Sequence, residues 1–511
     1  MFGRSDGVNW HLPEDYQSRL QPEYHDDHSS DVSDVVHQSE AYEVVKYLLG
    51  ATGRTTVIDI GCGSGRKLRE MPARRIGVDF GANIEFCRAN FPDCCEWIEA
   101  DLSDASARSV ANLANPDVIV ICADVVEHLP DPTQLLHALE DCYRRGAIVL
   151  TTTPDRIRVR GPDHAGPPPN TAHVREWSLD EYSKVVADSG LGLTFAGYTT
   201  NNSQARELKT ILTISDPDIG GHAVARNPDR PLAIIASYNE ADILDEVVAD
   251  WLGQGCDLHL IDNWSTDSSW EIARRWTATH PVRVSIERFP DTPSPTYEWI
   301  PILNRKADIA AGYPGRWIIH ADADEIRRSP FPSVNLADAF DLVAESGANR
   351  VDFRVINFQP ISATNVTSGA VQKSLRYFDF GTRAGHLTQS KAWLQGSSRV
   401  DLAETGGHAA RFEGAKDFRY KFLLKHYPLR SEKHARRKVE LERHARRSSF
   451  EHEVLKFHTQ YEALVETGFQ FRHQADFFQW DDDTFWQVYG LLIMTDLLSS
   501  RIERGWMEAG K

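Results

Sequence analysis

The chain has 511 residues, of which 41% are apolar and 10% aromatic, and at roughly 100 to 200 residues per domain this length predicts two to four domains. Its 56 basic and 74 acidic residues give a formal net charge of −18 at pH 7. Such a surface repels phosphate backbones and anionic lipid, which argues against a nucleic-acid-binding protein. No apolar stretch approaches the roughly 18 residues that cross a bilayer, and the first residues lack a secretory signal, so a cytoplasmic protein is expected.

The first α/β region follows a polar segment rich in Asp, His and Ser. An amphipathic helix is expected over residues 41–49, and short β-branched runs then alternate with helical stretches. The expected strands are Thr56–Ile60, Ile76–Val78, Val118–Ile121 and Ile148–Thr152. This alternation predicts βαβ units that build a doubly wound parallel sheet with helices on both faces.

A second strand and helix series begins after a polar passage that contains Gly and Pro, residues 215–231. Helices are expected over residues 241–254 and 269–277. The expected strands are Leu232–Ala236, Leu258–Ile261, Val282–Ile286 and Trp317–His320. A chain that opens two separate α/β sheets is expected to hold two separate ligand sites.

The C-terminal tail is expected to be helical from about residue 431. Its first part, EKHARRKVELERHARR, is strongly basic, which indicates a solvated helix face in preference to a patch for a phosphate-bearing partner. Its aromatic last part is expected to pack as a helix on the second domain. The predicted organisation is a polar arm, 1–40; a first α/β domain, 41–215; a linker, 216–231; a second α/β domain, 232–430; and a helical extension, 431–511.

A glycine-rich loop follows the first expected strand in the run TTVIDIGCGSGRKL. Gly61, Gly63 and Gly65 lie between this strand and a helix, where glycine permits a tight turn and the close approach of a ligand. Asp79 ends the next strand and is placed to accept hydrogen bonds from ribose hydroxyls, and Asp101 ends the third. These features predict a nucleotide-like ligand.

The motifs VIDIGCGSG, VDFG, EADL and PDVIVICADVVEHLPDP together resemble the class I S-adenosylmethionine-dependent methyltransferases over roughly residues 40–200. The resemblance implies S-adenosyl-L-methionine as cofactor, with Gly61, Gly63 and Gly65 at its methionine and ribose parts, Asp79 at the ribose hydroxyls and Asp101 near adenine. The spacing of the loop disfavours an NAD-dependent dehydrogenase.

His128 is the candidate catalytic base, because the sequence EHLPDP also occurs in O-methyltransferases of the ubiquinone-biosynthesis type; a packing role is the alternative. Asp124, Glu127 and His128 also have a D-x-x-E-H spacing that resembles the metal set of some methyltransferases, which His173 could complete.

Paired acids mark the second region. Asp262 ends its second expected strand, and the run RWIIHADADEI places Asp322 and Asp324 directly after an apolar strand. Two carboxylates on the same side of an extended chain can hold Mn²⁺ or Mg²⁺, whose charge neutralises a diphosphate leaving group.

The order ASYNE, LIDNWSTDSS, HADADEI resembles the GT-A-fold glycosyltransferases of the large inverting family over roughly residues 230–430. The resemblance implies that Glu240 and Asp262 bind the base and ribose of a nucleotide-sugar, that Asp322 lies near ribose or metal, and that Asp324 is a metal ligand.

Two roles in this region are open from sequence. His426, which is followed by Arg430 as a phosphate partner, is preferred over His408 as a third metal ligand. An inverting transferase also needs a carboxylate base, for which Asp401 is the guess. The other carboxylates considered are Glu325, Asp379 and Glu404.

The leading hypothesis is therefore a bifunctional enzyme, an O-methyltransferase joined to a metal-dependent glycosyltransferase of surface polysaccharide or glycolipid synthesis. Its partners would be a nucleotide-diphosphate sugar donor and a glycan or lipid-linked glycan acceptor, with peripheral membrane association and oligomeric state left open. The alternatives are a transferase with a non-catalytic methyltransferase-like docking domain, and a non-enzymatic interaction protein.

Overall fold

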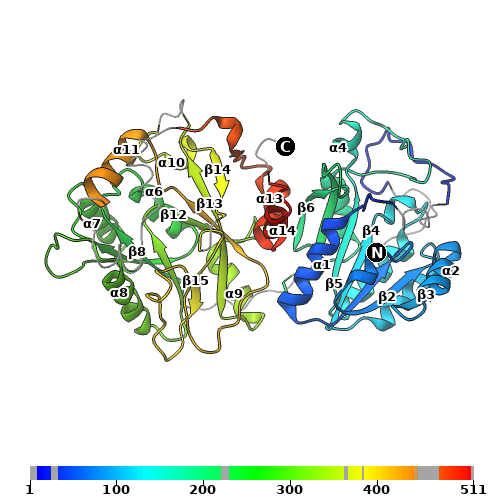
Figure 1. Ribbon diagram of the computed structural model, residues 1–511, viewed down its shortest axis with the longest axis horizontal. Helices are drawn as coiled ribbons and strands as arrows, with labels where there is room; N and C mark the ends of the chain where they lie inside the picture. Colours follow the sequence, from blue (N-terminus) through cyan, green and yellow to red (C-terminus); the bar gives the residue numbers. More distant parts are fainter. Residues whose placement is uncertain are drawn as a thin grey trace. The chain divides into compact units, whose positions relative to one another are not determined.

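The computed structural model of the chain describes residues 9–24, 33–219, 229–361, 366–382, 385–443, 446 and 471–507. It divides into two units (Figure 1), which are described separately below. The first unit comprises Met1–Ala223 together with Thr484–Ser500, and the second comprises Val224–Asp483 together with Arg501–Lys511. The predicted linker, 216–231, lies largely outside the described residues.

The first unit contains a seven-stranded sheet in the order β3-β2-β1-β4-β5-β7-β6. The first five strands are parallel, whereas β7 is antiparallel to both of its neighbours. The strands are β1 (Thr56–Ile60), β2 (Arg74–Asp79), β3 (Glu96–Glu99), β4 (Val118–Ala123), β5 (Ile148–Pro154), β6 (Phe195–Thr200) and β7 (Leu208–Ser215). This confirms the predicted doubly wound α/β fold of the first region.

Burial explains why the central strands could be found from sequence. Every residue of β1 and β4 is buried, as expected for parallel strands covered on both faces, which have continuous apolar sequences. The helices of this unit are α1 (Ser39–Thr52), α2 (Gly81–Asn90), α3 (Thr133–Arg144), α4 (Arg156–Arg160) and α5 (Leu179–Asp188), with 3-10 turns at Leu68–Glu70, Ala105–Leu113 and Val126–His128.

One further helix of the first unit comes from the far end of the chain. Helix α13 (Phe485–Met494) packs against β6, where Gly490 lies beside the ring of Phe195. The aromatic part of the C-terminal tail was expected to pack on the second domain, and that expectation is wrong for α13. Its apolar residues cover the last strand of the first sheet, a pairing about 290 residues apart that no local pattern reveals.

The second unit contains a ten-stranded mixed sheet. Its main order is β10-β9-β8-β11-β15-β13-β14-β17, and β16 pairs with β12 and β13. The four strands from β10 to β11 are parallel. The strands are β8 (Leu232–Ser237), β9 (Asp257–Asp262), β10 (Val284–Arg288), β11 (Trp317–Asp322), β12 (Glu325–Arg328), β13 (Arg350–Gln359), β14 (Tyr377–Phe380), β15 (Thr388–Leu394), β16 (Phe422–His426) and β17 (Phe478–Gln479).

Helices follow β8 and β9 as the sequence predicted, α8 follows β10 without having been predicted, and the core between helices and strands is apolar. Trp299, Ile302 and Leu303 of α8 pack with β8 and β11 residues in one buried cluster. The helices are α6 (Leu244–Gly253), α7 (Ser269–Thr279), α8 (Trp299–Ala311), α9 (Leu336–Glu345), α10 (Val371–Ser374) and α11 (Glu432–Arg436), followed by a π-helix, Arg437–Arg443, and a 3-10 turn, Gln474–Asp476. Helix α14 (Leu497–Glu503) includes the last residues of the first unit and the first residues of the final segment of the second. Across the described residues, none of these helices has the length and apolarity needed to span a bilayer.

The contact between α13 and β6 predicts that a larger side chain at Gly197 destabilises the first unit. A Cβ at Gly197 would lie 2.6 Å from the backbone oxygen of Gln487 and 2.5 Å from the Phe195 ring. Gly197→Val should therefore lower the free energy of unfolding by about 1–3 kcal/mol, as overpacking does, although valine favours strands. The measurement is differential scanning calorimetry of the full chain.

Gly50→Ala is the matched control, because no atom lies within 4 Å of a Cβ at this helical position. It should stabilise by about 0.5–1 kcal/mol. A Gly197→Val protein that melts at the wild-type temperature would contradict the packing of α13 on β6.

Candidate functional site

The glycine loop of the first unit has the backbone conformation that its sequence predicts. Gly61, Gly63 and Gly65 have φ values of 77°, 56° and 70°, in the left-handed region that favours glycine. A Cβ at Gly61 would collide with Val125, and one at Gly65 with Trp97. The loop therefore requires glycine at both positions, because no larger side chain fits between β1 and its neighbours.

Asp79 lies against this loop at the carboxyl end of β2. Its Oδ2 accepts a hydrogen bond from the N–H of Gly63 at 2.8 Å, and its Oδ1 accepts one from the N–H of Phe80 at 2.8 Å. The structure thus brings the predicted acid and the predicted loop together, and a carboxylate at this position can accept hydrogen bonds from the hydroxyls of a ribose-bearing ligand. Asp101 follows β3, where its Oδ1 accepts from the N–H and hydroxyl of Ser103 at 2.9 and 2.6 Å, so its carboxylate also stabilises its own turn.

His128 follows β4 in a short 3-10 turn. Its Nδ1 lies 3.0 Å from the carbonyl oxygen of Ala172, and because a carbonyl only accepts, Nδ1 carries the proton and Nε2 the lone pair. The ring of His173 lies edge-on at 4.8 Å between centroids. Arg19 of the N-terminal segment donates to the carbonyl oxygens of His173 and Pro168 at 3.2 and 2.6 Å. The N-terminal segment therefore contacts the loop that presents this histidine pair.

The structure gathers three of the four residues of the alternative metal set. Ligand atoms of Glu127, His128 and His173 lie within 4.8 Å of one another. Glu127 is fully buried, and burial raises its pKa well above the usual value. Asp124 instead accepts from the hydroxyl of Thr152 at 2.7 Å and from Gln38.

The other contacts of His173 limit its use as a metal ligand. Its Nδ1 lies 2.8 Å from a carboxylate oxygen of Glu176, and its Nε2 lies 2.9 Å from the side-chain nitrogen of Asn170. Both ring nitrogens are therefore occupied by protein partners. A metal ion at this cluster would have to displace Asn170, which favours the interpretation of His128 as a base.

In the second unit, the loops that follow β8 and β9 are joined by Asn239. Its φ is 56°, and its Oδ1 accepts from the N–H groups of Thr266 and Asp267 at 2.7 and 3.2 Å. Asp262, the last residue of β9, contacts Nε of Arg288 at 3.3 Å, and burial raises its pKa. The predicted nucleotide-binding positions thus lie in one pair of linked loops at the carboxyl edge of the parallel strands.

Two buried lysines neutralise Asp322 at the end of β11. Nζ of Lys306 lies 3.5 Å from one carboxylate oxygen and Nζ of Lys391 lies 3.6 Å from the other. Although burial alone opposes ionisation, these lysines hold the pKa of Asp322 below its usual value. Burial lowers the pKa of Lys306 to about 8. Glu325 also pairs with Lys391, at 2.8 Å, and with Arg327, at 2.7 Å, so it is not available as a catalytic base.

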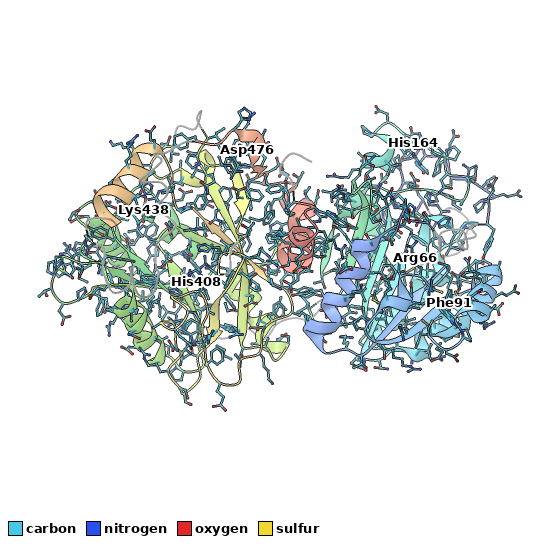
Figure 2. The ribbon with its side chains drawn as sticks, viewed as in Figure 1. Arg66, Phe91, His164, His408, Lys438 and Asp476 are labelled. Carbon is cyan, nitrogen blue, oxygen red and sulfur yellow. The ribbon has the colours of Figure 1, made fainter. Side chains whose placement is uncertain are left out.

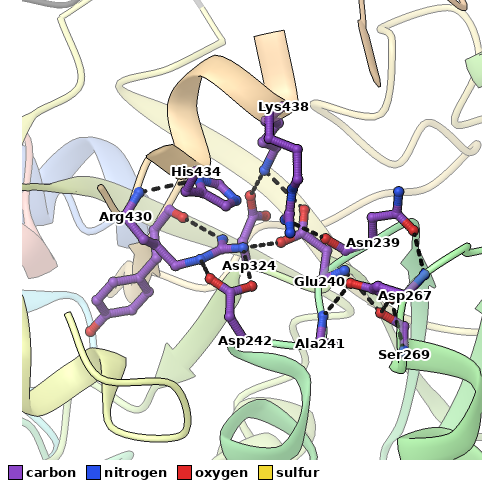
Figure 3. Close-up of polar contacts among 12 residues, drawn as sticks. Asn239, Glu240, Ala241, Asp242, Asp267, Ser269, Asp324, Arg430, His434 and Lys438 are labelled. Atoms are coloured by element: carbon purple, nitrogen blue, oxygen red, sulfur yellow. Dashed lines mark hydrogen bonds and ion pairs between the residues drawn. The ribbon is translucent and has the colours of Figure 1, made fainter. Parts of the chain in front are cut away.

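Asp324 and Glu240 share an ammonium group (Figure 3). Nζ of Lys438 lies 2.8 Å from Oδ2 of Asp324 and 2.9 Å from Oε1 of Glu240. Arg430, which is fully buried, pairs with the other oxygen of Glu240 and with both oxygens of Asp242. These contacts correct two predictions: the basic segment is not simply a solvated face, and Arg430 binds carboxylates of its own chain.

The predicted metal pair is only partly assembled. Nε2 of His426 lies 3.8 Å from Oδ1 of Asp324, and its Nδ1 lies 2.8 Å from the side-chain oxygen of Asn357. His408 instead lies 2.6 Å from the carbonyl oxygen of Gly385. Because Lys438 already neutralises Asp324, Asp324 and His426 do not fit a divalent ion, and their predicted role in binding Mn²⁺ or Mg²⁺ receives no support from this geometry. Ligand atoms of Glu240, Asp242 and His434 do lie within 4.8 Å of one another, but Arg430 pairs with both of these acids.

Asp401 is not brought to this cluster. It is exposed, and its Oδ1 accepts from the N–H groups of Ala403 and Glu404 at 2.8 and 3.2 Å, the pattern of a turn. Within the described residues no hydrogen bond or ion pair joins it to Asp322 or Asp324. The guess that Asp401 is the base therefore receives no support from this geometry.

Sequence reasoning missed the basic side chains that hold the acids in place. Lys306 interrupts the apolar run of α8, and this charge among apolar residues was the available signal. Lys438 lies in the segment EKHARRKVELERHARR, which was predicted to be a solvated face, so its burial had no signal of this kind. Figure 2 shows Lys438 on the helical segment that follows α11. Its partners are distant in sequence, which is why no spacing pattern pointed to them.

Comparison with known proteins concerns the first unit. Residues 25–194 match the family model described as a methyltransferase domain. The chain is 29% identical over 142 residues to a protein of Mycolicibacterium smegmatis named "Probable S-adenosylmethionine-dependent methyltransferase". This match covers 26% of this chain and 51% of that protein. It is 30% identical over 105 residues to the ubiquinone biosynthesis O-methyltransferase of Stutzerimonas stutzeri, covering 20% and 44% respectively.

The chain thus spans about half the length of the curated relatives it matches. Among solved structures, a SAM-dependent methyltransferase from Aquifex aeolicus is 15% identical, with a TM-score of 0.26, over 35% of this chain and 89% of that one. The family match, the strand order and the glycine loop agree with one another. The first unit therefore contains a class I S-adenosylmethionine-dependent methyltransferase domain, which the family model matches over residues 25–194.

Proposed function

We propose that the first unit transfers a methyl group from S-adenosylmethionine to an oxygen atom of a small molecule, such as a sugar. The observation that carries this proposal is the contact between the glycine loop and Asp79, with His128 at the same carboxyl edge of the sheet. The similarity to ubiquinone biosynthesis O-methyltransferases supports oxygen as the acceptor atom.

When bound, S-adenosylmethionine supplies the reactive methyl group. In this chain, the carboxylate of Asp79 would hold the ribose hydroxyls, while Gly61, Gly63 and Gly65 let the backbone approach the cofactor. Nε2 of His128 carries the lone pair and would take the proton from the acceptor hydroxyl. The contacts of Arg19 with the loop at His173 would shield this reaction from water.

Asp79→Asn tests the cofactor site. The amide keeps the shape of the side chain but removes the negative charge, so S-adenosylmethionine should bind about 10-fold to 100-fold more weakly by isothermal titration calorimetry. Asp93→Asn, at an exposed aspartate, is the control and should bind normally. Equal affinity in both variants would refute the role of Asp79.

We further propose that the second unit transfers a sugar from a nucleotide-diphosphate donor to a glycan or lipid-linked glycan. Two of its parallel strands, β9 and β11, end at Asp262 and Asp322, and Glu240 lies in the loop that follows β8. Ligands of open α/β sheets bind at the carboxyl ends of such strands. The resemblance of these motifs to GT-A glycosyltransferases supports a nucleotide-sugar as the ligand.

A row of polar residues suggests the catalytic base. Glu325, His426, Asn357 and Asp379 are directly opposite one another on the adjacent strands β12, β16, β13 and β14. Residues directly opposite one another on paired strands lie on the same face of the sheet. Asp379 and His426 are separated by two strand spacings, about 10 Å. Burial raises the pKa of Asp379, against the lowering effect of Arg472, which pairs with its carboxylate at 2.7 Å. Because this arginine is exposed, unlike the buried partners of Glu325, it can move aside and leave a carboxylate that accepts a proton.

Asp379→Asn should reduce the hydrolysis of a nucleotide-diphosphate sugar about 100-fold or more, because water then lacks its base. The assay is nucleoside diphosphate release from a panel of donors by the full chain. Asp401→Asn is the matched comparison and should retain wild-type turnover. If Asp401→Asn were the slower enzyme, the assignment of Asp379 would be wrong.

Both proposed reactions could serve one product, a methylated surface polysaccharide or its glycolipid precursor. A second candidate keeps sugar transfer and gives the first unit a docking role. The contact between the carboxylate of Asp79 and the glycine loop favours two reactions over a docking role. A docking surface does not need a buried acid beside a loop of three glycines in the left-handed region.

A further inference from the structure

The ammonium group of Lys438 occupies the position that a divalent ion would need in the second unit. It lies between Asp324 and Glu240, at 2.8 and 2.9 Å from their oxygens, and the lysine is only 4% exposed. Figure 3 shows it pointing into the carboxylate cluster from the helical segment above. The two acids that a metal would use are therefore already bridged by a buried cation.

The surrounding charges are balanced without a metal ion. Each acid of the cluster is paired with lysine or arginine at distances of up to 3.6 Å. A divalent ion would add two positive charges beside a buried ammonium, where repulsion is weakly screened. The acids are Glu240, Asp242, Asp322, Asp324 and Glu325, and the basic partners are Lys306, Arg327, Lys391, Arg430 and Lys438.

Lys438 is held in place by the C-terminal strap, defined here as the described residues 430–443 and 446. Within it, Arg437 donates to the carbonyl oxygen of Asn239 at 2.8 Å. Glu442 accepts from the side chain of Asn239 at 2.9 Å, and Arg446 donates to the side-chain oxygen of Asn263 at 3.1 Å. The strap thus crosses the loops after β8 and β9, with Lys438 at the loop after β11.

We propose that Lys438 is the resident cation of this site and takes the place of a divalent metal, so that a nucleoside diphosphate binds here without one. The ammonium would then be shared between a phosphate oxygen and the carboxylates of Asp324 and Glu240, which fix its position. The identity of the ligand rests on the proposed function of the second unit, whereas the exclusion of metal by Lys438 does not.

Binding of Mn²⁺ alone tests the exclusion. Electron paramagnetic resonance of the full chain should show no wild-type Mn²⁺ site that depends on Asp324. Lys438→Met should create a site that binds Mn²⁺ at least about 10-fold more tightly than wild type, and Lys438→Met combined with Asp324→Asn should lose it. Lys438→Arg, which keeps the positive charge, should resemble wild type.

A wild-type Mn²⁺ site that disappears in Asp324→Asn would overturn the proposal, and this result does not depend on whether Lys438→Met folds. Lys438→Met with no gain in Mn²⁺ binding, in a protein with wild-type circular dichroism, would also overturn it.

Uridine diphosphate binding tests the ligand. Wild type should bind it in EDTA within about 3-fold of its affinity in Mn²⁺, and Lys438→Met should bind at least about 10-fold more weakly in EDTA. Wild-type binding that needs Mn²⁺ would contradict the proposal. If a panel of nucleoside diphosphates fails to bind under both conditions, the proposed function is refuted, and the Mn²⁺ titration alone decides the role of Lys438.

Discussion

The carboxyl edge of a parallel sheet is the constraint on which both sites depend. Parallel strands end at one edge, so the residues that follow them converge even when they are far apart in sequence. In the first unit this brings the loop after β1 into contact with Asp79 at the end of β2. In the second it brings Glu240, Asp262 and Asp322 to the ends of β8, β9 and β11. The same geometry therefore yields two separate sets of chemically useful groups.

The sequence predicted these edges well because the strands that form them are buried on both faces. The run at β1 was placed at its observed ends, Thr56–Ile60, and the run at β11 fell within its observed bounds. The conformations of Gly61, Gly63 and Gly65 also followed from local sequence, since only glycine adopts them readily. Where an element's environment is set by its own residues, the prediction was successful.

The remaining features depend on partners that are distant in the chain. Helix α13 covers β6 across about 290 residues, and Lys438 meets Glu240 across 198. Asp401 was chosen as the base by residue type alone. Its carboxylate accepts a hydrogen bond from the N–H of Ala403 and so stabilises a local turn. Asp379 lies opposite Asn357 only because of the register in which β13 and β14 pair. No periodicity or spacing specifies such pairings, because they arise when the sheet and its covering segments assemble.

The buried charges of the second unit carry an energetic consequence. Removing a carboxylate from water is costly unless a partner compensates, and Lys438 and Arg430 supply that compensation for Glu240. The strap is thereby tied to the site through ion pairs as well as through backbone contacts. Any ligand that enters here must either use these cations or replace them, which links ligand binding to the position of the strap.

We propose that one chain holds two independent ligand sites, one for a sulfonium nucleoside and one for a nucleoside diphosphate. Titration calorimetry of S-adenosylmethionine into the full chain, with and without saturating nucleoside diphosphate, tests this most directly. One S-adenosylmethionine should bind per chain, with the same affinity in both titrations. Failure to bind S-adenosylmethionine, or competition between the two ligands for one site, would contradict it.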